Sequence, residues 1–193
     1  AYALGVGALK SAESVPHLID TLRKDKYESA RVMSAWSLGE LVDKRAVEPL
    51  IDSLVKGKDK QKEAPAVINA VITALDKLAG SAIDPLIAVL NNKDIDEVSK
   101  SYSARILGLI QSPNAVDTLV KALQSESVVI RSESAKALGL IEDRRATEPL
   151  INVLKDDWIT VRTNALVSLG TIKDERCILP MIDELKANIT AGR

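Results

Sequence analysis

Hydrophobic positions recur along this chain in pairs of helical stripes that are separated by short polar turns. Residues 146–154 carry apolar side chains at helical spacing, and the polar segment 155–157 ends this first predicted helix. A second helix is predicted over about residues 159–169, after which Gly170 is expected to let the chain turn or pack closely. The buried stripe of the second helix consists of Val161, Ala165, Ser168 and Ile172.

The same helical hairpin recurs throughout the chain, and a Leu-Gly pair near the end of each second helix marks it. The copies are Leu4-Gly5, Leu38-Gly39, Leu107-Gly108, Leu138-Gly139 and Leu169-Gly170, with Leu78-Ala79 as a weaker sixth copy. The last three Leu-Gly copies are 31 residues apart. A fixed period of this size indicates a solenoid, in which each unit buries its apolar face against its neighbours.

We therefore expect an all-α, right-handed superhelix of about six helical hairpins, built as one array over residues 1–193. The predicted units are residues 1–10, 11–43, 44–80, 81–111, 112–142, 143–173 and a partial unit 174–193. Residues 56–65 interrupt the array with a Lys-rich insertion, which is expected to be an exposed loop. Both ends fall within a repeat, so we expect either a piece of a longer array or an array that has lost its capping repeats, and in either case uncapped ends that could associate.

Composition narrows the classes of function. Aromatic residues make up only 3% of the chain and Phe is absent, so the core must consist of Ala, Leu, Ile and Val. The 26 basic and 27 acidic residues are interspersed, which disfavours nucleic-acid binding. One Cys and one His exclude a disulfide framework and a Cys- or His-rich metal site, so we expect no metal and no cofactor. No apolar run approaches membrane-spanning length and no signal peptide is visible, so we expect a cytoplasmic protein without a membrane segment.

The repeated motif resembles a known family. Residues 143–151 read Asp-Arg-Arg-Ala-Thr-Glu-Pro-Leu-Ile, and Val161-Arg162 opens a helix that ends in Leu-Gly. This pattern resembles HEAT repeats, and its short period is similar to that of the HEAT-like repeats named after phycobilisome lyases. The resemblance implies a structural ladder in which Arg31, Arg131 and Arg162 meet acids of the turns, with Lys100 and Val71 at the same place in the irregular units. It implies little about function, because such repeats serve many unrelated tasks.

The concave face of a solenoid is the expected binding surface, and the second helices usually line it. The residues that should face it lie nine, five and two positions before the marker Leu and two positions after it, and they differ in every unit. From these positions we select Tyr2, Met33, Trp36, Glu40, Asp76, Tyr102, Arg105, Glu133, Lys136 and Asn164 as partner-binding residues. The hypothesis is an apolar groove centred on Met33, Trp36, Tyr102 and Arg105 that grips a protein segment. The alternative is that Trp36 and Tyr102 fill gaps between irregular repeats.

Catalytic chemistry has little support in the sequence. His17 and Asp20 share a helix face but are more typical of a solvated surface, and Cys177 is more typical of a small core residue than of a nucleophile. We predict no catalytic residue and expect a non-enzymatic scaffold or adaptor that binds a protein. One alternative is a bilin-lyase subunit acting on phycobiliproteins, which rests on the resemblance alone. A nucleic-acid-binding module is a third, less favoured alternative.

Overall fold

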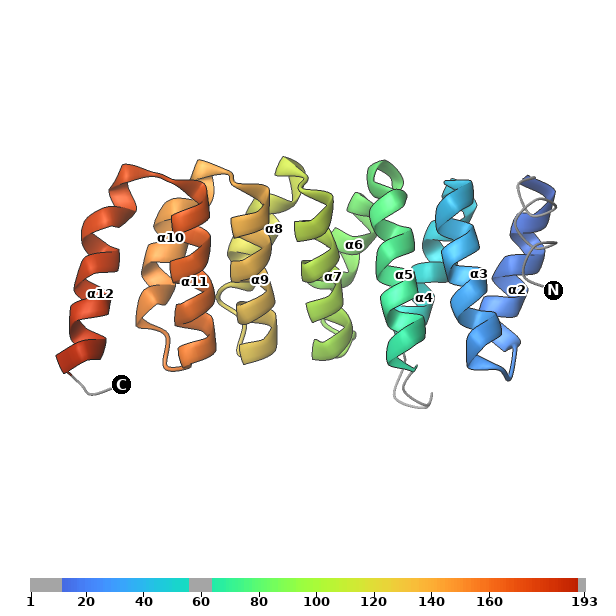
Figure 1. Cartoon of the computed structure of the whole chain (residues 1–193), viewed down its shortest axis with the longest axis horizontal. Coiled ribbons are helices and arrows are strands. Elements are labelled where there is room, and N and C mark those ends of the chain that lie inside the picture. The colour runs from blue at the N-terminus through green and yellow to red at the C-terminus, as the bar shows by residue number, and fades with distance from the viewer. Residues whose placement is uncertain (1–11, 56–63, 191–193) are drawn as a thin grey trace.

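The chain folds into helical hairpins arranged in a row (Figure 1). The computed structural model describes residues 12–55 and 64–190, and within them it contains helices and turns but no strand. The first helices of the hairpins are α2 (Val15–Lys24), α4 (Val47–Leu54), α6 (Ala79–Asn91), α8 (Val116–Ala122), α10 (Thr147–Asn152) and α12 (Ile178–Thr190). The second helices are α3 (Glu28–Leu41), α5 (Pro65–Lys77), α7 (Glu97–Ile110), α9 (Val128–Ile141) and α11 (Ile159–Ile172). Short 3-10 turns precede most of the first helices, and another, Val153–Lys155, continues α10.

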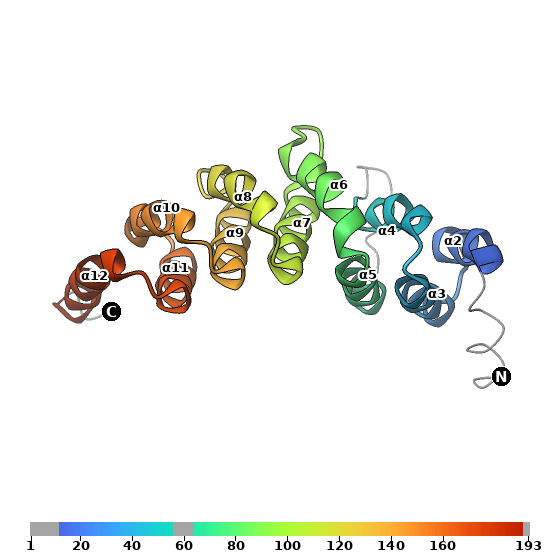
Figure 2. The same ribbon diagram turned by 90° about the horizontal axis from the view of Figure 1, so that it is seen from above.

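The helices form two layers that curve into an arch (Figure 2). The helices α2, α4, α6, α8 and α10 form the convex layer, and α3, α5, α7, α9 and α11 form the concave layer. This arrangement confirms the all-α right-handed superhelix expected from the sequence. Tyr2, the first Leu-Gly copy and most of the Lys-rich insertion lie outside the described residues.

The marker Leu residues form the centre of the core. Leu38, Leu107, Leu138 and Leu169 have no exposed surface, and each is the eleventh residue of its second helix. Their helices bury small residues on the same side, such as Ala135 and Ala165, so neighbouring helices can approach closely. The buried stripe expected in α11 is confirmed, because Val161, Ala165, Ser168 and Ile172 are all buried.

Three of the four described marker glycines permit this close approach between second helices. A methyl group on Gly39 would lie 2.7 Å from the Cα of Ala74, and one on Gly108 would lie 2.6 Å from the Cα of Ala137. Gly139 faces Ser168 in the same way. Each of these glycines therefore meets a small residue that immediately precedes the eleventh position of the next second helix.

The expectation that Gly170 lets the chain turn or pack closely is wrong in both parts. Gly170 lies inside α11, and no atom would lie within 4 Å of a methyl group added to it. The helix ends three residues later at Lys173, whose φ of 54° is left-handed. The equivalent residues Val42, Gln111 and Glu142 end α3, α7 and α9 in the same conformation.

The register assigned to the irregular third unit is also wrong. The eleventh residue of α5 is Leu75, and Ala74 before it packs on Gly39 as the repeat requires. The marker pair is therefore Leu75-Asp76 rather than Leu78-Ala79. Leu78 instead joins α5 directly to α6, without the capped turn found at the other links between repeats.

This change of register explains a discontinuity in the array. Asp76 takes the place of the marker Gly, and Ile106 in α7 takes the place of the small residue that should face it. Two larger side chains cannot fit where Gly and Ala fit elsewhere. Accordingly, α5 and α7 pack together much less extensively than the other neighbouring second helices (Figure 1).

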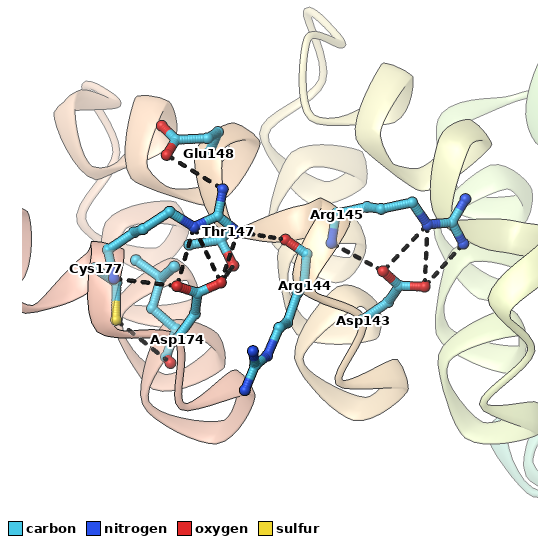
Figure 3. A network of polar contacts seen from close by, with 9 residues as sticks. Asp143, Arg144, Arg145, Thr147, Glu148, Asp174 and Cys177 are labelled. Atoms are coloured by element: carbon cyan, nitrogen blue, oxygen red, sulfur yellow. Dashed lines mark hydrogen bonds and ion pairs between the residues drawn. The ribbon is translucent and has the colours of Figure 1, made fainter.

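An aspartate and an arginine connect the repeats at the links that lead from a second helix to the next first helix (Figure 3). Asp143 Oδ1 accepts a hydrogen bond of 2.8 Å from the backbone N–H of Arg145, and its carboxylate also holds the guanidinium of Arg145. That guanidinium reaches back to the preceding repeat, where it donates to Asp117 Oδ1 at 3.2 Å and to the carbonyl of Pro113 at 2.9 Å. The same aspartate–arginine pair recurs as Asp43–Arg45 and Asp174–Arg176.

The predicted arginine ladder is present in the C-terminal repeats. Arg131 donates to both carboxylate oxygens of Asp156, at 2.6 and 3.0 Å, and also to the backbone carbonyls of Ser125 and Glu126. We call the turn between the first and second helix of a repeat its hairpin turn. The Arg131–Asp156 pair is largely buried, and it joins the hairpin turns of two successive repeats. A two-pronged pair of this kind is among the stronger polar contacts in proteins.

The neighbouring ladder position follows the same plan. Arg162 donates to the carbonyls of Asp156 and Asp157 and pairs with Glu184 of α12 at 3.3 Å. Arg31 likewise donates to the carbonyl of Asp25 in its own hairpin turn, at 2.7 Å. In the corrected register, the ladder position of α5 is Ile68 rather than Val71, because the arginines are the fourth residues of their helices.

These contacts make folding sensitive to acid. The hydrogen bond from Arg45 lowers the pKa of Asp43 to about 2, and the hydrogen bonds from Arg131 lower the pKa of Asp156. A carboxyl whose pKa is depressed in the folded state stabilises that state above its unfolded pKa of about 3.9. The contribution is lost as the pH falls through the folded pKa.

We predict that Asp156→Asn lowers stability at pH 7 and reduces its loss in acid. In the wild type, Asp156 Oδ1 accepts a hydrogen bond of 2.9 Å from the backbone N–H of Trp158, and the amide oxygen of Asn can accept the same bond. The substitution does remove the negative charge that pairs with Arg131. Urea unfolding followed by circular dichroism should show the free energies of the two proteins converging between about pH 5 and pH 2. Parallel curves over that range would contradict the role assigned to the carboxylate.

The last described helix, α12, exposes apolar side chains at positions that are buried or half-buried in its counterparts. Ile182 and Leu185 are exposed, whereas Ile51 and Leu54 at the same positions of α4 are buried. The cause is that each other first helix is covered by the second helix of its own hairpin, and within the described residues no second helix follows α12. Association through uncapped ends stays a prediction.

Candidate protein-binding surface

The second helices present one stripe of side chains to the concave face. In α9 this stripe contains Val129, Glu133, Lys136 and Leu140, which lie one helical turn apart, on the side away from the fully buried Leu138. Val129 and Leu140 are exposed although they are apolar. The stripe therefore combines apolar contact surface with charge.

A groove of about 450 Å³ crosses α7, α9 and α11. Three exposed apolar residues line it, Leu109 from α7, Leu140 from α9 and Val167 from α11. Its charged lining residues are Arg105, Glu133 and Lys136. The groove floor contains Gly139 and Ser168, so the close approach of α9 and α11 also shapes this surface.

The residues proposed as the centre of an apolar groove are not gathered in one place. Arg105 lines the groove described above, whereas Met33 and Trp36 lie on α3, which α5 separates from α7. Tyr102 is half-buried and packs against the core, as the gap-filling alternative expects. Trp36 is 41% exposed, so it does not fill a gap.

Trp36 instead belongs to a small polar cluster that the sequence analysis missed in part. The ammonium group of Lys77 lies 5.9 Å from the centre of the Trp36 ring and forms an ion pair with Glu40. Lys77 was not selected because the register of α5 was shifted by three residues, which assigned Gly80 to the stripe position of Lys77 and Asp76 to that of Thr73. Asp76 is exposed but occupies the position of the marker Gly.

The remaining selected residues differ in how far their side chains are available to contact a partner. Glu133 and Lys136 form a loose ion pair of 3.9 Å at the groove. Asn164 is half-buried, and its amide donates to the hydroxyl and carbonyl oxygens of Ser132 at 2.8 and 3.2 Å, so it connects α11 to α9. Leu109, Leu140 and Val167 occupy positions that the sequence pattern assigns to the concave stripe, but they were not among the residues selected for partner binding.

Three side chains were considered for chemistry, His17, Asp20 and Cys177, and their surroundings in the structure are as follows. His17 is exposed on α2, and Asp20 on the same helix pairs with Lys24 at 2.5 Å. Cys177 is buried, and its sulfur lies 3.8 Å from the carbonyl oxygen of Leu169, which agrees with the core role predicted for it. Over residues 12–55 and 64–190 we find no group of three or more His, Cys, Asp or Glu side chains arranged to hold a metal ion. No helix in these segments is both long and apolar enough to cross a bilayer.

Comparisons with known proteins agree with this architecture. The family model of HEAT repeats matches residues 15–103 and again residues 83–170. These matches cover most of the chain, so the protein belongs to the HEAT-repeat family. No curated protein sequence matches the chain.

Several solved structures share the fold. The complex of CpcE and CpcF of phycocyanin lyase from Nostoc sp. PCC7120 gives a TM-score of 0.62 at 24% identity, over 77% of this chain and 91% of that chain. A designed armadillo-repeat protein in complex with the peptide (KR)4 gives 0.52 at 17% identity, over 86% and 89% of the two chains. An engineered protein gives 0.50 at 20% identity, over 91% and 87%. At these identities the likeness concerns the fold alone.

Proposed function

We propose that the protein is a non-enzymatic scaffold that binds an apolar segment of another protein in its concave groove. The observation that carries this proposal is the meeting of Leu109, Leu140 and Val167 from three successive second helices in one groove. Exposed apolar side chains that gather in a hollow with a charged rim are typical of protein-binding sites. The protein and peptide complexes formed by the fold relatives support the proposal by analogy.

The charges at the groove indicate what the bound segment should contain. Glu133 and Lys136 lie close enough to compensate each other, whereas Arg105 is exposed and forms no ion pair within the described part of the chain. An acidic side chain in the partner would form an ion pair with the guanidinium of Arg105. Arginine is one of the residue types that often contribute most of the binding free energy at interfaces. The proposed ligand is therefore a segment with apolar side chains and at least one carboxylate.

The test is a comparison of variants against peptides selected from a random library on the wild-type protein. Leu140→Glu places a charge in the apolar part of the groove and should weaken binding by about tenfold or more. Val42→Glu is the matched control, because Val42 is exposed at a helix end where the equivalent residue is already Glu142. Fluorescence anisotropy of labelled peptides would give the dissociation constants.

Two outcomes decide between this groove and other surfaces. Selected peptides that are rich in apolar and acidic residues, with binding weakened by Leu140→Glu and by Arg105→Ala but not by Val42→Glu, would support the proposal. If the Leu140→Glu, Arg105→Ala and Val42→Glu variants all bind the selected peptides with the same affinity as the wild-type protein, the proposal is overturned. Trp36→Ala in the same assay would show whether a long segment extends to the cluster on α3.

The bilin-lyase alternative concerns chemistry rather than binding. It is supported only by the shared fold with phycocyanin lyase and makes a separate prediction, the covalent attachment of a bilin to a phycocyanin subunit. Mass spectrometry of that subunit after incubation with bilin and the protein would detect the added mass. The cytoplasmic location expected from the sequence also stays a prediction.

A further inference from the structure

Two successive hairpin turns form equivalent clefts that differ in charge. The later cleft has a volume of about 330 Å³, and Arg131, Asn152 and Asp156 are among its lining residues. The earlier cleft has a volume of about 210 Å³ and is lined by the residues that precede these by one 31-residue repeat. Those residues are Lys100, Lys121 and Ser125, in the same order.

The later cleft contains its own anion. The carboxylate of Asp156 accepts hydrogen bonds of 2.6 and 3.0 Å from Arg131, so the basic ladder residue is neutralised inside the protein. The same carboxylate accepts the backbone N–H of Trp158 and thereby shapes the hairpin turn. Charge and turn geometry are both supplied by one aspartate.

The earlier cleft retains the turn but lacks the anion. Ser125 Oγ accepts the backbone N–H of Ser127 at 3.2 Å, as Asp156 does for Trp158, but a hydroxyl carries no charge. Lys121 adds a second basic group where the later cleft has Asn152. Neither the Lys100 nor the Lys121 ammonium group makes a hydrogen bond or an ion pair within the described part of the chain, and the hydrogen bonds of these residues are made by their backbones.

Acidic side chains near this cleft have other partners. Glu97 Oε2 accepts a hydrogen bond of 2.6 Å from the hydroxyl of Ser127, and Asp96 accepts one from the hydroxyl of Ser99 at the start of α7. Asp117, four residues before Lys121 on α8, pairs with Arg145 of the next repeat. The cleft therefore has two ammonium groups and no carboxylate among its lining residues.

We propose that the cleft between Lys100, Lys121 and Ser125 binds an oxyanion, a carboxylate or a phosphate, in the place that the Asp156 carboxylate occupies one repeat later. Thr118 and Asn91 also line the cleft and add a hydroxyl and an amide that can donate hydrogen bonds to oxygen. A half-buried Lys100 in a narrow cleft attracts an anion more strongly than a lysine on an open surface. The site lies at the hairpin turns and is independent of the concave groove.

The probes for this site are inorganic phosphate and acetate, added to the full chain at constant ionic strength. Saturable shifts of amide signals in residues 118–125 are expected in two-dimensional nitrogen–proton spectra, and chloride should not produce them. Ser125→Asp places a carboxylate of the protein itself in the cleft. The substitution should keep the turn, because Asp25 and Asp156 at the equivalent positions accept a hydrogen bond from the backbone N–H two residues later, as Ser125 does. It should weaken phosphate binding by about tenfold or more and raise the melting temperature without phosphate.

Two further variants make the result specific. Lys121→Asn installs the residue of the next repeat, so it should fold normally while weakening phosphate binding. Lys155→Asn removes a lysine of the later cleft and should leave phosphate binding unchanged. A response to phosphate that equals the response to chloride, or that is the same in all variants, would overturn the proposal.

A second comparison distinguishes the sources of the anion. If a short glutamate peptide competes with phosphate and binds more tightly than acetate, the ligand is an acidic protein segment. If phosphate binds more tightly than both, the ligand is a free or esterified phosphate. Either result would support an oxyanion site.

Discussion

Replacing Gly108 with Ala is expected to destabilise the protein by about 2–3 kcal/mol. The added methyl group would lie 2.6 Å from the Cα of Ala137, which is backbone of the neighbouring helix and cannot rotate away. Relief requires α7 and α9 to move apart, and that movement would loosen the packing around Leu107 and Leu138. Urea unfolding followed by circular dichroism would measure the loss.

The matched control is Gly170→Ala, a change at the same position of a later repeat. No atom lies within 4 Å of the added methyl group there, and Gly170 is in the interior of α11. Because Ala favours the helix over Gly by about 0.5–1 kcal/mol, this variant should be slightly more stable than the wild type. Effects of the same sign at both positions would contradict the close-packing role assigned to Gly108.

Leu138→Ala is expected to cost about 2–5 kcal/mol. Leu138 has no exposed surface and lies in the continuous core between α7, α9 and α11, so truncation leaves a cavity that fixed helices cannot fill. The same unfolding measurement applies, and thermal melting should show a lower midpoint. Binding in the concave groove should change only as far as α9 itself shifts.

Leu140→Ala is the control for this second prediction, because it removes the same atoms two residues further along α9. Leu140 is 42% exposed on the concave face, so its truncation should cost less than about 1 kcal/mol. The two leucines therefore separate stability from binding, with one expected to affect mainly the core and the other mainly the groove. Similar losses of stability in both variants would contradict that separation.

The repeat architecture explains why stability and binding can be separated in this protein. Residues that contact the next repeat, such as Gly108 and Ala137, must satisfy a distance set by the backbone, and they change little from unit to unit. Residues on the concave stripe meet solvent, so Trp36, Arg105, Lys136 and Val167 can differ at one repeat position without disturbing the array. A binding surface can thus vary over a constant core.

The candidate sites were less accessible to sequence analysis than the fold. Arg105, Glu133 and Lys136, which were selected as partner-binding residues, line the groove, but the sequence did not indicate that the groove lies beside them rather than beside Trp36. Lys77 was missed because Leu78-Ala79 looked more like the Leu-Gly pair than Leu75-Asp76 does. The cleft at Lys100 required a comparison of contacts between two repeats, which no single motif contains.

The resemblance to HEAT repeats implied the arginine ladder, whereas the sequence pattern by itself determined the helical hairpins, the solenoid and the buried marker leucines. These features depend on spacing within one repeat and on its recurrence, and both are visible in a linear pattern. Tertiary structure alone decided the register of α5, the weak packing of α5 on α7, the position of the groove and the charge of the cleft at Lys100. The physical reason is that each of these depends on which side chain a neighbouring repeat places opposite, and the irregular link between α5 and α6 changes that pairing where the sequence period is broken.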